Sequence, residues 1–306
     1  MSQRTQRAAR DLVLLLNDRL VPAARATISA LDRGFVYGDG LFETVRTYAG
    51  EPFGLRQHLS RLARSARLFR IPFEPAASYW LPRVRRCLRA NDLLTTDAAV
   101  RLTVSRGAGP FGIIPPAELR PTTMMLATPV DPRLPRAQAR GVTICFFPFR
   151  LVTATLPSHK TLHYLPAVLG KMIARRRGAW EAVYLGADDT VLEGTTSNVF
   201  AVERGRLITP PLHGILPGVT RHVLTTLAKR AGVPLLERRL TRRQLLTADE
   251  VLLTASTIEI LPVVRVEQTR IGNGAPGPVT QALQEHYHRH VARTLARATP
   301  RHSDRL

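Results

Sequence analysis

Strand-like and helix-like segments follow one another along this chain without the strict alternation that a doubly wound parallel sheet requires. In the first half, strand-like runs at residues 41–48, 100–104 and 123–126 accompany a run at 55–69 whose apolar residues recur at helical spacing. In the second half, a helix predicted at 219–230 stands among several short strand-like runs. The pattern predicts an α+β fold, and 306 residues are enough to bury one or two full cores.

A boundary between two domains is expected near Pro148, which interrupts an apolar stretch between the two halves. The predicted N-terminal domain covers residues 1–147, and the predicted C-terminal domain covers residues 148–298. Residues 1–10 and 299–306 are expected to be disordered ends.

The composition bears on the compartment in which the chain works. No apolar run is long enough to cross a membrane, and the arginine-rich start at residues 1–10 is followed by no apolar run of signal-peptide length and no cleavage site. A cytoplasmic protein is therefore predicted, with a short mitochondrial-type transit peptide as the alternative because such peptides are also rich in arginine. Cys87 and Cys145 form neither a CxxC pair nor a metal-ligand spacing, so neither a disulfide nor a metal site is expected.

The formal net charge of +21 would favour nucleic acid or an anionic membrane as a partner if it were concentrated on one face. The arginines instead occur in nearly every segment, and no long run of like charges stands out. A solvated basic surface is the favoured interpretation, with no nucleic acid and no membrane as partner. A basic nucleic-acid-binding protein is a remote alternative, which tight, salt-sensitive binding of DNA without a bound chromophore would favour.

Lysine is rare in this basic chain: of 44 basic residues, only Lys160, Lys171 and Lys229 are lysines. Since arginine cannot form an imine, each lysine is a candidate for chemistry that requires an amine. Lys160 lies where a segment opened by Pro157 enters a predicted helix, which suits an amine held in a cleft, and a surface lysine is the alternative. Lys171 and Lys229 lie inside predicted helices with basic neighbours, which is typical of a solvated face.

Glu193 stands where a strand opens into a turn of small polar residues at 194–198. A buried carboxylate in such a place can hold a pyridine nitrogen protonated, which makes the ring an electron sink. The alternative is an exposed carboxylate at the end of a strand.

Several residues are suited to binding a phosphate. A turn opens a helix at Val219 and Thr220, where free backbone N–H groups and the positive end of the helix dipole favour an anion. Ser256 and Thr257 follow an apolar strand, and Arg61 lies on a predicted helix, so these three can add further donors. Structural capping is the alternative for Ser256 and Thr257, and a surface charge is the alternative for Arg61.

Six sequence blocks occur in the order found in the class IV, or fold type IV, pyridoxal-phosphate aminotransferases, and the chain resembles that family from about Asn17 to Thr280. The family includes branched-chain aminotransferases, D-amino-acid aminotransferases and aminodeoxychorismate lyases. One block would be modest evidence, whereas six in order are strong. The blocks are Asp32-Arg33-Gly34 through Gly38-Asp39-Gly40-Leu41-Phe42-Glu43-Thr44, His58-Leu59-Ser60-Arg61-Leu62, Lys160-Thr161-Leu162-His163-Tyr164-Leu165, Glu193-Gly194-Thr195-Thr196-Ser197-Asn198-Val199-Phe200, Leu216-Pro217-Gly218-Val219-Thr220-Arg221 and Ser256-Thr257-Ile258-Glu259-Ile260-Leu261-Pro262-Val263.

The resemblance implies a role for each candidate residue. Lys160 would carry pyridoxal 5′-phosphate as a Schiff base, Glu193 would pair with the pyridine nitrogen, and Tyr164 would lie near the phenolic oxygen of the cofactor. The phosphate would be bound by Arg61, Val219, Thr220, Ser256 and Thr257, and the substrate pocket would be lined by Tyr37, Phe42 and Arg101.

The resemblance also implies a smaller N-terminal α/β domain and a larger pyridoxal-phosphate-binding domain, with the cofactor in the cleft between them. A homodimer is expected, in which a loop of the partner helps to close the site. The reaction would be transamination, in which Lys160 takes the α-proton of an amino donor and the amino group passes to a 2-oxo acid acceptor.

The identity of the amino donor stays open at the level of sequence. Phe42 and Tyr37 resemble the aromatic wall of branched-chain enzymes, and Arg101 falls on the strand where those enzymes place an arginine. Against that, Ala99 stands where they tend to have a tyrosine. The loop at 105–113 lacks the Arg-x-His pair with which typical D-amino-acid enzymes hold the substrate carboxylate.

A transaminase for branched-chain L-amino acids or D-amino acids is the predicted function, because the segments at 254–259 and 272–280 look more like transaminases than lyases. The alternative is an aminodeoxychorismate lyase, which uses the same lysine and cofactor to release pyruvate and 4-aminobenzoate. The segment around Lys160 and the motif at 38–40 look more like D-amino-acid enzymes and lyases, and His163 replaces the asparagine usual in its block. Product analysis separates the two, since a lyase needs no amino acceptor.

Overall fold

The computed structural model describes residues 12–151 and 158–298. Helices and sheets are mixed in both halves of the chain, which confirms the predicted α+β class. The ends that were expected to be disordered, residues 1–10 and 299–306, lie outside the described residues. No helix among the residues that the structure describes is both long and apolar enough to span a membrane.

Contacts within the chain divide it into two compact units. The first unit comprises Met1–Pro132 together with His159–Leu165, and the second comprises Arg133–Ser158 together with Pro166–Leu306. The chain therefore returns once to the first unit after it has entered the second. The domain boundary predicted after residue 147 lies inside the second unit.

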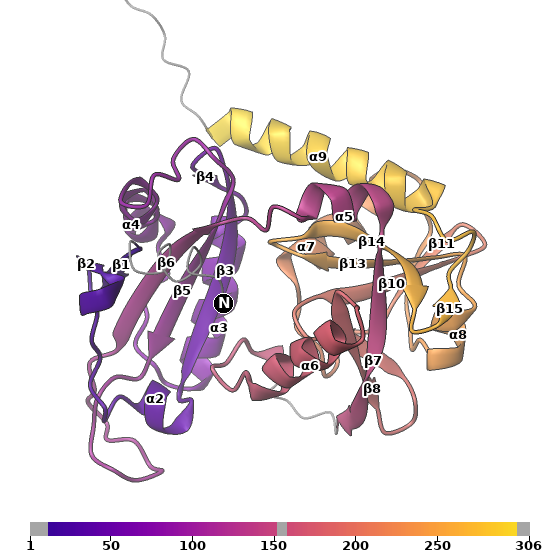
Figure 1. The fold of residues 1–306 in the computed structure, drawn as a ribbon. Helices are drawn as coiled ribbons and strands as arrows, with labels where there is room; N and C mark the ends of the chain where they lie inside the picture. The colour runs from indigo at the N-terminus through magenta and orange to yellow at the C-terminus, as the bar shows by residue number, and fades with distance from the viewer. Residues whose placement is uncertain (1–11, 152–157, 299–306) are drawn as a thin grey trace, which may run out of the picture. The chain divides into compact units, whose positions relative to one another are not determined.

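The first unit is built on a six-stranded antiparallel sheet with the strand order β2-β1-β6-β5-β3-β4. Strands β1 and β2 form a hairpin, and Asn17 and Asp18 connect them with positive φ angles of 46° and 67°. The long strands β3, β5 and β6 run next to one another in this sheet (Figure 1). The strands are β1 (Val13–Leu16), β2 (Arg19–Pro22), β3 (Gly40–Tyr48), β4 (Glu51–Pro52), β5 (Ala98–Ser105) and β6 (Thr122–Pro129).

Two amphipathic helices, α3 (Leu55–Leu68) and α4 (Ala77–Arg89), pack on this sheet. The sequence predicts the second of them over residues 84–94, whereas the observed helix begins earlier and contains Pro82, a residue that lacks an N–H and clashes with the preceding helical turn. In the structure α4 passes through Pro82, since the helical start places the indole of Trp80 in the core with 4% of its surface exposed. Burial of a large aromatic side chain outweighs the proline penalty here.

The second unit contains a nine-stranded mixed sheet, whose strands follow the order β12-β11-β10-β13-β14-β7-β8-β9 with β15 paired to β14. The apolar stretch that was expected to link two domains is strand β7, which pairs in parallel with β14 and β8. The register shifts between Phe146 and Arg150, so the ladder accommodates Pro148 as an irregularity within the strand. The strands are β7 (Val142–Leu151), β8 (Glu181–Gly186), β9 (Val191–Gly194), β10 (Asn198–Glu203), β11 (Arg206–Thr209), β12 (Leu235–Glu237), β13 (Glu250–Ala255), β14 (Glu259–Val266) and β15 (Thr269–Arg270).

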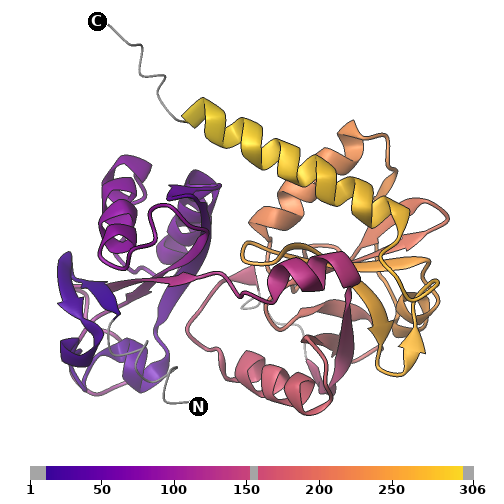
Figure 2. The same ribbon diagram turned by 45° about the horizontal axis from the view of Figure 1, so that its top comes forward.

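The helices of the second unit include α7, whose bounds agree with the helix predicted at 219–230, and the long helix α9. These two helices, α7 and α9, contact each other, and α9 also lies against β13 and β14 (Figure 2). Buried apolar side chains on α7 and on the strands of the sheet fill the space between that helix and the sheet. The helices are α5 (Leu134–Arg140), α6 (Leu165–Arg176), α7 (Val219–Arg230), α8 (Arg242–Leu246) and α9 (Pro278–Ala298), and the first unit adds the short η1 (Ala23–Arg25) and α2 (Arg33–Tyr37).

Candidate active site

The segment that carries Lys160 pairs with the beginning of β3 in the first unit. The backbone N–H of Phe42 donates to the carbonyl of Lys160 at 2.9 Å, and the N–H of Leu162 donates to the carbonyl of Gly40 at 3.0 Å. Gly40 permits this approach, because a Cβ atom there would lie 2.6 Å from a methyl of Leu162 and 2.7 Å from the carbonyl oxygen of Val104. The lysine backbone is therefore fixed by a strand that itself pairs with β5 from Gly40 to Thr47.

The side chains of Lys160, Arg101 and Tyr164 gather around the ring of Phe42. The lysine Nζ lies 4.5 Å from the centre of that ring, and the Arg101 guanidinium carbon lies 3.6 Å from it. Tyr164 meets Phe42 edge-on with the ring centres 5.0 Å apart. Burial lowers the pKa of Arg101, while the nearby Tyr164 hydroxyl opposes that shift. The structure thus brings two predicted pocket residues, Phe42 and Arg101, to the predicted catalytic amine.

Arg61 is buried in the first unit and is held by a carboxylate. Its Nε and Nη2 donate to the two oxygens of Glu43, each at 2.7 Å, and the ring Nδ1 of His58 lies 2.7 Å from the same carboxylate. Burial would raise the pKa of Glu43, but the charges and hydrogen bonds of Arg61 and His58 outweigh it and lower the pKa to about 2. The carboxylate is therefore ionised at neutral pH, and the surface-charge alternative for Arg61 does not hold.

Glu193 lies on β9 of the second unit, with one of its oxygens held by two N–H donors. The side-chain amide of Asn198 donates to Oε2 at 3.2 Å, and the backbone N–H of Leu216 donates to the same oxygen at 3.0 Å. Asn198 also donates to the Leu216 carbonyl at 2.9 Å. The turn at 194–198 therefore folds its last side chain back onto the carboxylate that precedes it.

The predicted phosphate-binding residues of the second unit lie around Asn198. Gly218 precedes α7 without a side-chain cap among the described residues, and a Cβ atom on it would lie 2.1 Å from the Asn198 side-chain oxygen. Asn198 in turn is paired across the sheet with Thr254, close to the turn that holds Ser256 and Thr257. The structure thus gathers the start of α7, which contains Val219 and Thr220, and the 256–257 turn near the amide that holds Glu193.

A second buried carboxylate, Glu181, lies beneath the polar turn after Glu193. The hydroxyls of Thr195, Thr196 and Ser197 donate to it, the last two at 2.8 and 3.3 Å, and Lys171 Nζ lies 3.0 Å from it. The prediction of a solvated face for Lys171 holds only in part, because its side chain is 39% exposed but its amine compensates the fully buried charge of Glu181. The same prediction for Lys229 is confirmed, since that residue is exposed on α7.

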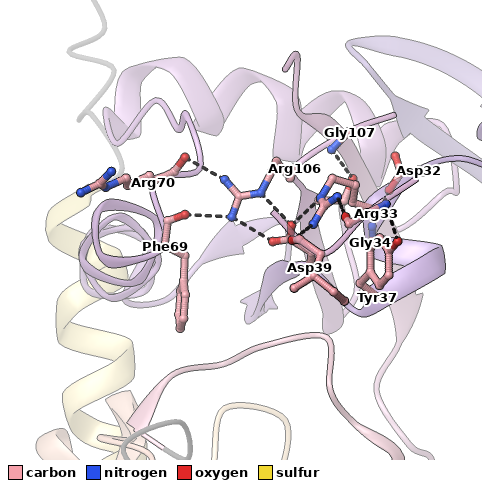
Figure 3. A network of polar contacts seen from close by, with 12 residues as sticks. Asp32, Arg33, Gly34, Tyr37, Asp39, Phe69, Arg70, Arg106 and Gly107 are labelled. Carbon is pink, nitrogen blue, oxygen red and sulfur yellow. Dashed lines mark hydrogen bonds and ion pairs between the residues drawn. The ribbon is translucent and has the colours of Figure 1, made fainter. Parts of the chain in front are cut away.

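The block at residues 32–40 forms the short helix α2 and then a network of polar contacts (Figure 3). Asp39 accepts hydrogen bonds from Arg33 at 2.9 Å and from Arg106 at 2.7 and 3.0 Å. Arg33 donates in turn to the carbonyls of Gly112 and Ile113, each at 2.7 Å. The network therefore ties the loop after β5 to the beginning of β3.

Tyr37 belongs to this network rather than to the contacts around Phe42. Its hydroxyl oxygen accepts a hydrogen bond from the Gly112 N–H at 2.8 Å, and its ring packs against Arg33 and Phe111. Its predicted place in the substrate pocket stays a prediction.

Four residues that organise the site carry no role in the sequence analysis: Glu43, His58, Glu181 and Asn198. Three of them lie inside the recognised blocks, but a block does not show which side chains meet. His58 and Arg61 are three residues apart on α3 and thus share a helix face, which is the one signal that the sequence offers for their cluster. Glu181 stands outside every block, in an apolar strand.

The sequence from residue 40 to residue 266 matches the family model described as amino-transferase class IV, so the chain belongs to that family. A protein of Methanocaldococcus jannaschii that carries a provisional assignment as a branched-chain-amino-acid aminotransferase is 38% identical over 276 residues, which are 90% of this chain and 94% of that protein. The aminodeoxychorismate lyase of Bacillus subtilis is 33% identical over 91% of this chain and 94% of its own length.

Solved structures agree with this membership. The branched-chain aminotransferase of Thermoproteus uzoniensis, crystallised with norvaline, matches with a TM-score of 0.81 at 32% identity and covers 92% of this chain and 94% of its own. The protein is therefore a class IV aminotransferase of fold type IV, and the cofactor of this class is pyridoxal 5′-phosphate.

The residues of this chain fit that cofactor. Taken by itself, the first unit holds an amine at Lys160 and a fixed guanidinium at Arg61. The second unit, also taken by itself, holds a helix start without a side-chain cap among the described residues and an anchored carboxylate at Glu193. An amine, an anion-binding set and a carboxylate are the groups that an aldehyde, a phosphate and a pyridinium nitrogen need. Among the described residues, no group of His, Cys, Asp and Glu is arranged to hold a metal ion.

Proposed function

We propose that the protein is a transaminase that moves the amino group of a branched-chain amino acid to a 2-oxo acid. The observation that carries the proposal is the set of contacts around Phe42, where the Lys160 amine and the Arg101 guanidinium lie 4.5 and 3.6 Å from one aromatic ring. A movable amine beside a cation and an apolar wall suits a substrate that has a carboxylate and an apolar side chain.

Lys160 is the proposed catalytic residue. When bound, pyridoxal phosphate supplies an electron sink that stabilises negative charge at the substrate α-carbon. The Lys160 amine would hold the cofactor and, when free, would take the α-proton of the substrate on Nζ as a general base. The hydrogen bond between Phe42 and the lysine carbonyl keeps the lysine backbone in place while its side chain moves.

Glu193 is proposed to hold a proton on the pyridine nitrogen. Its Oε2 is engaged by the donors of Asn198 and Leu216, which fixes the plane of the carboxylate. Fixing the acceptor reduces the reorganisation that would otherwise accompany the development of charge on the ring.

Arg101 is proposed to bind the substrate carboxylate, because a guanidinium forms forked hydrogen bonds to carboxylates. The apolar character of the loop after β5 suits a donor with an apolar side chain, and its lack of the Arg-x-His pair of typical D-amino-acid enzymes favours a branched-chain L-amino acid. That loop presents Phe111, Ile113 and Ile114, whose side chains are 84%, 78% and 88% exposed.

The same exposed side chains support a homodimer as the working state. Three large apolar side chains on one loop are costly in water unless another surface covers them. Arg33 holds the loop by two carbonyls, so the apolar surface has a defined shape in the single chain. Sedimentation of the purified protein tests this, and a monomer at working concentration would contradict it.

The test of the function is an absorption spectrum of the purified protein before and after addition of L-leucine, D-alanine or an (R)-amine. Loss of the lysine-linked cofactor band with L-leucine, and recovery with a 2-oxo acid, is the expected result. A band that no donor removes, together with release of pyruvate and 4-aminobenzoate from aminodeoxychorismate, would instead establish the lyase that the Bacillus subtilis relative represents.

Replacement of Lys160 tests its role, and replacement of an exposed lysine gives the matched control. Lys160→Ala should abolish the band shift and turnover while leaving the melting temperature of the cofactor-free protein nearly unchanged. Lys229→Ala removes an exposed lysine and should leave both intact. Full turnover in Lys160→Ala would refute the assignment.

A further inference from the structure

Glu43 is a carboxylate with 1% of its surface exposed, on a strand whose residues are mostly buried. Taking a carboxylate and a guanidinium out of water costs several kcal/mol for each ion, and apolar residues of similar size often stabilise a core better. A buried pair of this kind is therefore weak evidence for a role in stability alone. Its position calls for another explanation, since Glu43 directly follows Phe42, whose ring packs against Lys160.

The geometry of the pair is specific. Glu43 uses one oxygen for Arg61 Nε and the other for Arg61 Nη2, each at 2.7 Å, so the two side chains meet through two parallel hydrogen bonds. A guanidinium is planar and rigid, so two bonds along one edge fix the direction of its whole plane. A single carboxylate thus determines where the rest of the Arg61 group points.

His58 completes the arrangement from the same helix. Its Nδ1 lies 2.7 Å from Glu43 Oε2, on the face of α3 that also carries Arg61. Burial lowers the pKa of His58, although the Glu43 charge opposes this, and the charges of Arg61 and Lys160 lower the pKa further. The neutral ring donates to Glu43 without bringing a third charge into the core.

We propose that Glu43 is a positioning residue for phosphate binding: it fixes the plane of the Arg61 guanidinium, with His58 as its second anchor, and thereby sets how strongly the protein prefers a phosphorylated cofactor. This inference rests on the proposed function, in which Arg61 binds the cofactor phosphate. Glu43 is not itself a ligand of the phosphate, because a carboxylate repels a phosphate.

Because of that repulsion, the direction of the change in phosphate binding distinguishes two possible roles of Glu43. If Glu43 did no more than balance the charge of Arg61, removing its negative charge would strengthen the attraction of Arg61 for phosphate. If Glu43 positions Arg61, the same change weakens phosphate binding because the fork is no longer held. The two roles therefore predict opposite results from one substitution.

The measurement is the ratio of the dissociation constants of pyridoxal and pyridoxal 5′-phosphate, obtained by absorbance titration of the full-length, cofactor-free protein. The ratio isolates the phosphate, because both compounds present the same ring and aldehyde. Glu43→Gln should lower it about tenfold, the effect of one charge-assisted hydrogen bond. The phosphorus resonance of the bound cofactor should also shift towards that of the free compound.

Three further variants complete the design. Glu43→Asp keeps the charge but is too short for both contacts, so it should also lower the ratio, and it carries the test if Glu43→Gln does not fold. Arg61→Lys keeps the charge and removes the fork, so Glu43→Gln should have no further effect in that background. Glu51→Gln removes a partly exposed carboxylate paired with Arg85 in the same unit and should leave the ratio unchanged.

The outcomes separate this inference from the proposed function. An unchanged or increased ratio in Glu43→Gln and Glu43→Asp, or full additivity with Arg61→Lys, would overturn the positioning role while leaving the transaminase assignment standing. A wild-type protein with no preference for the phosphorylated compound would instead overturn the role of Arg61 itself.

Discussion

Gly218 is expected to be intolerant of any side chain, although its backbone is ordinary. Its φ of −64° and ψ of 136° suit every residue, so alanine introduces no backbone strain. The obstacle is space: an alanine Cβ would lie 2.1 Å from Asn198 Oδ1, where non-bonded contacts below 3.0 Å essentially do not occur. Either Asn198 or the start of α7 has to move by about 1 Å, the difference between those two distances.

The cost follows from what Asn198 does. Its amide is 4% exposed and donates to Glu193 at 3.2 Å and to the Leu216 carbonyl at 2.9 Å. Overpacking costs about 1–3 kcal/mol, and a weakened buried hydrogen bond adds about 1 kcal/mol. We therefore expect Gly218→Ala to lower the free energy of unfolding by about 2–4 kcal/mol. Turnover should fall as well, because Glu193 loses a fixed partner.

Denaturant unfolding of the cofactor-free protein measures the first effect, and steady-state turnover of the reconstituted protein measures the second. The control is Asn198→Ala, which removes the Asn198 Oδ1 atom that the new Cβ would contact. In that background Gly218→Ala should cost less than about 1 kcal/mol. If Gly218→Ala is as costly in the Asn198→Ala background as in the wild type, the steric explanation is wrong.

Three other predictions follow from buried ionisable groups. The pKa of Glu43 is about 2 in the folded protein against an ordinary value of 4.5, so this carboxylate stabilises the fold above pH 4.5 and loses that contribution as the pH falls towards 2. The loss is about 3 kcal/mol, at about 1.4 kcal/mol per pKa unit. The free energy of unfolding should therefore change less with pH across that range in Glu43→Gln than in the wild type. Lys171→Met leaves Glu181 buried with only hydroxyl partners and should cost about 1–3 kcal/mol, whereas the exposed Lys229→Met should change the free energy of unfolding by less than about 0.5 kcal/mol; equal effects would contradict the buried pair. Burial raises the pKa of Cys87 to about 11, so iodoacetamide should label it only after unfolding, and stoichiometric labelling of the native protein by mass spectrometry would refute this.

The sequence predicts well those elements in which local pattern and tertiary packing agree. The helix at 219–230 has a clear turn before it and Gly232 after it, and its observed bounds are the predicted ones. Strand β7 shows the opposite case, because an apolar stretch with an internal proline looks like a linker. In the structure it pairs with a strand more than a hundred residues further along the chain. Long-range pairing of this kind has no signal in a single sequence.

The candidate site divides in the same way. The rarity of lysine draws attention to Lys160, which is one of three lysines in the chain. The order of the family's sequence blocks draws attention to Glu193. Lys171 shows the limit of that reasoning, since its helix looks solvated and only the fold brings it to Glu181 from the neighbouring strand. The role of a residue whose partner lies on another helix or strand cannot be predicted before the fold shows which elements are neighbours.

The residues hidden in this way share a function in the site. Gly40 admits the backbone of the lysine segment, Glu43 holds Arg61, and Asn198 holds Glu193. Each acts on a group that has a predicted contact with the cofactor, and none needs to touch the cofactor itself. Because such a residue works through one partner, its effect should vanish when that partner is replaced, whereas a residue that only supports the fold keeps its effect. The two pairs tested above, Glu43 with Arg61 and Gly218 with Asn198, apply this criterion once in each unit of the chain.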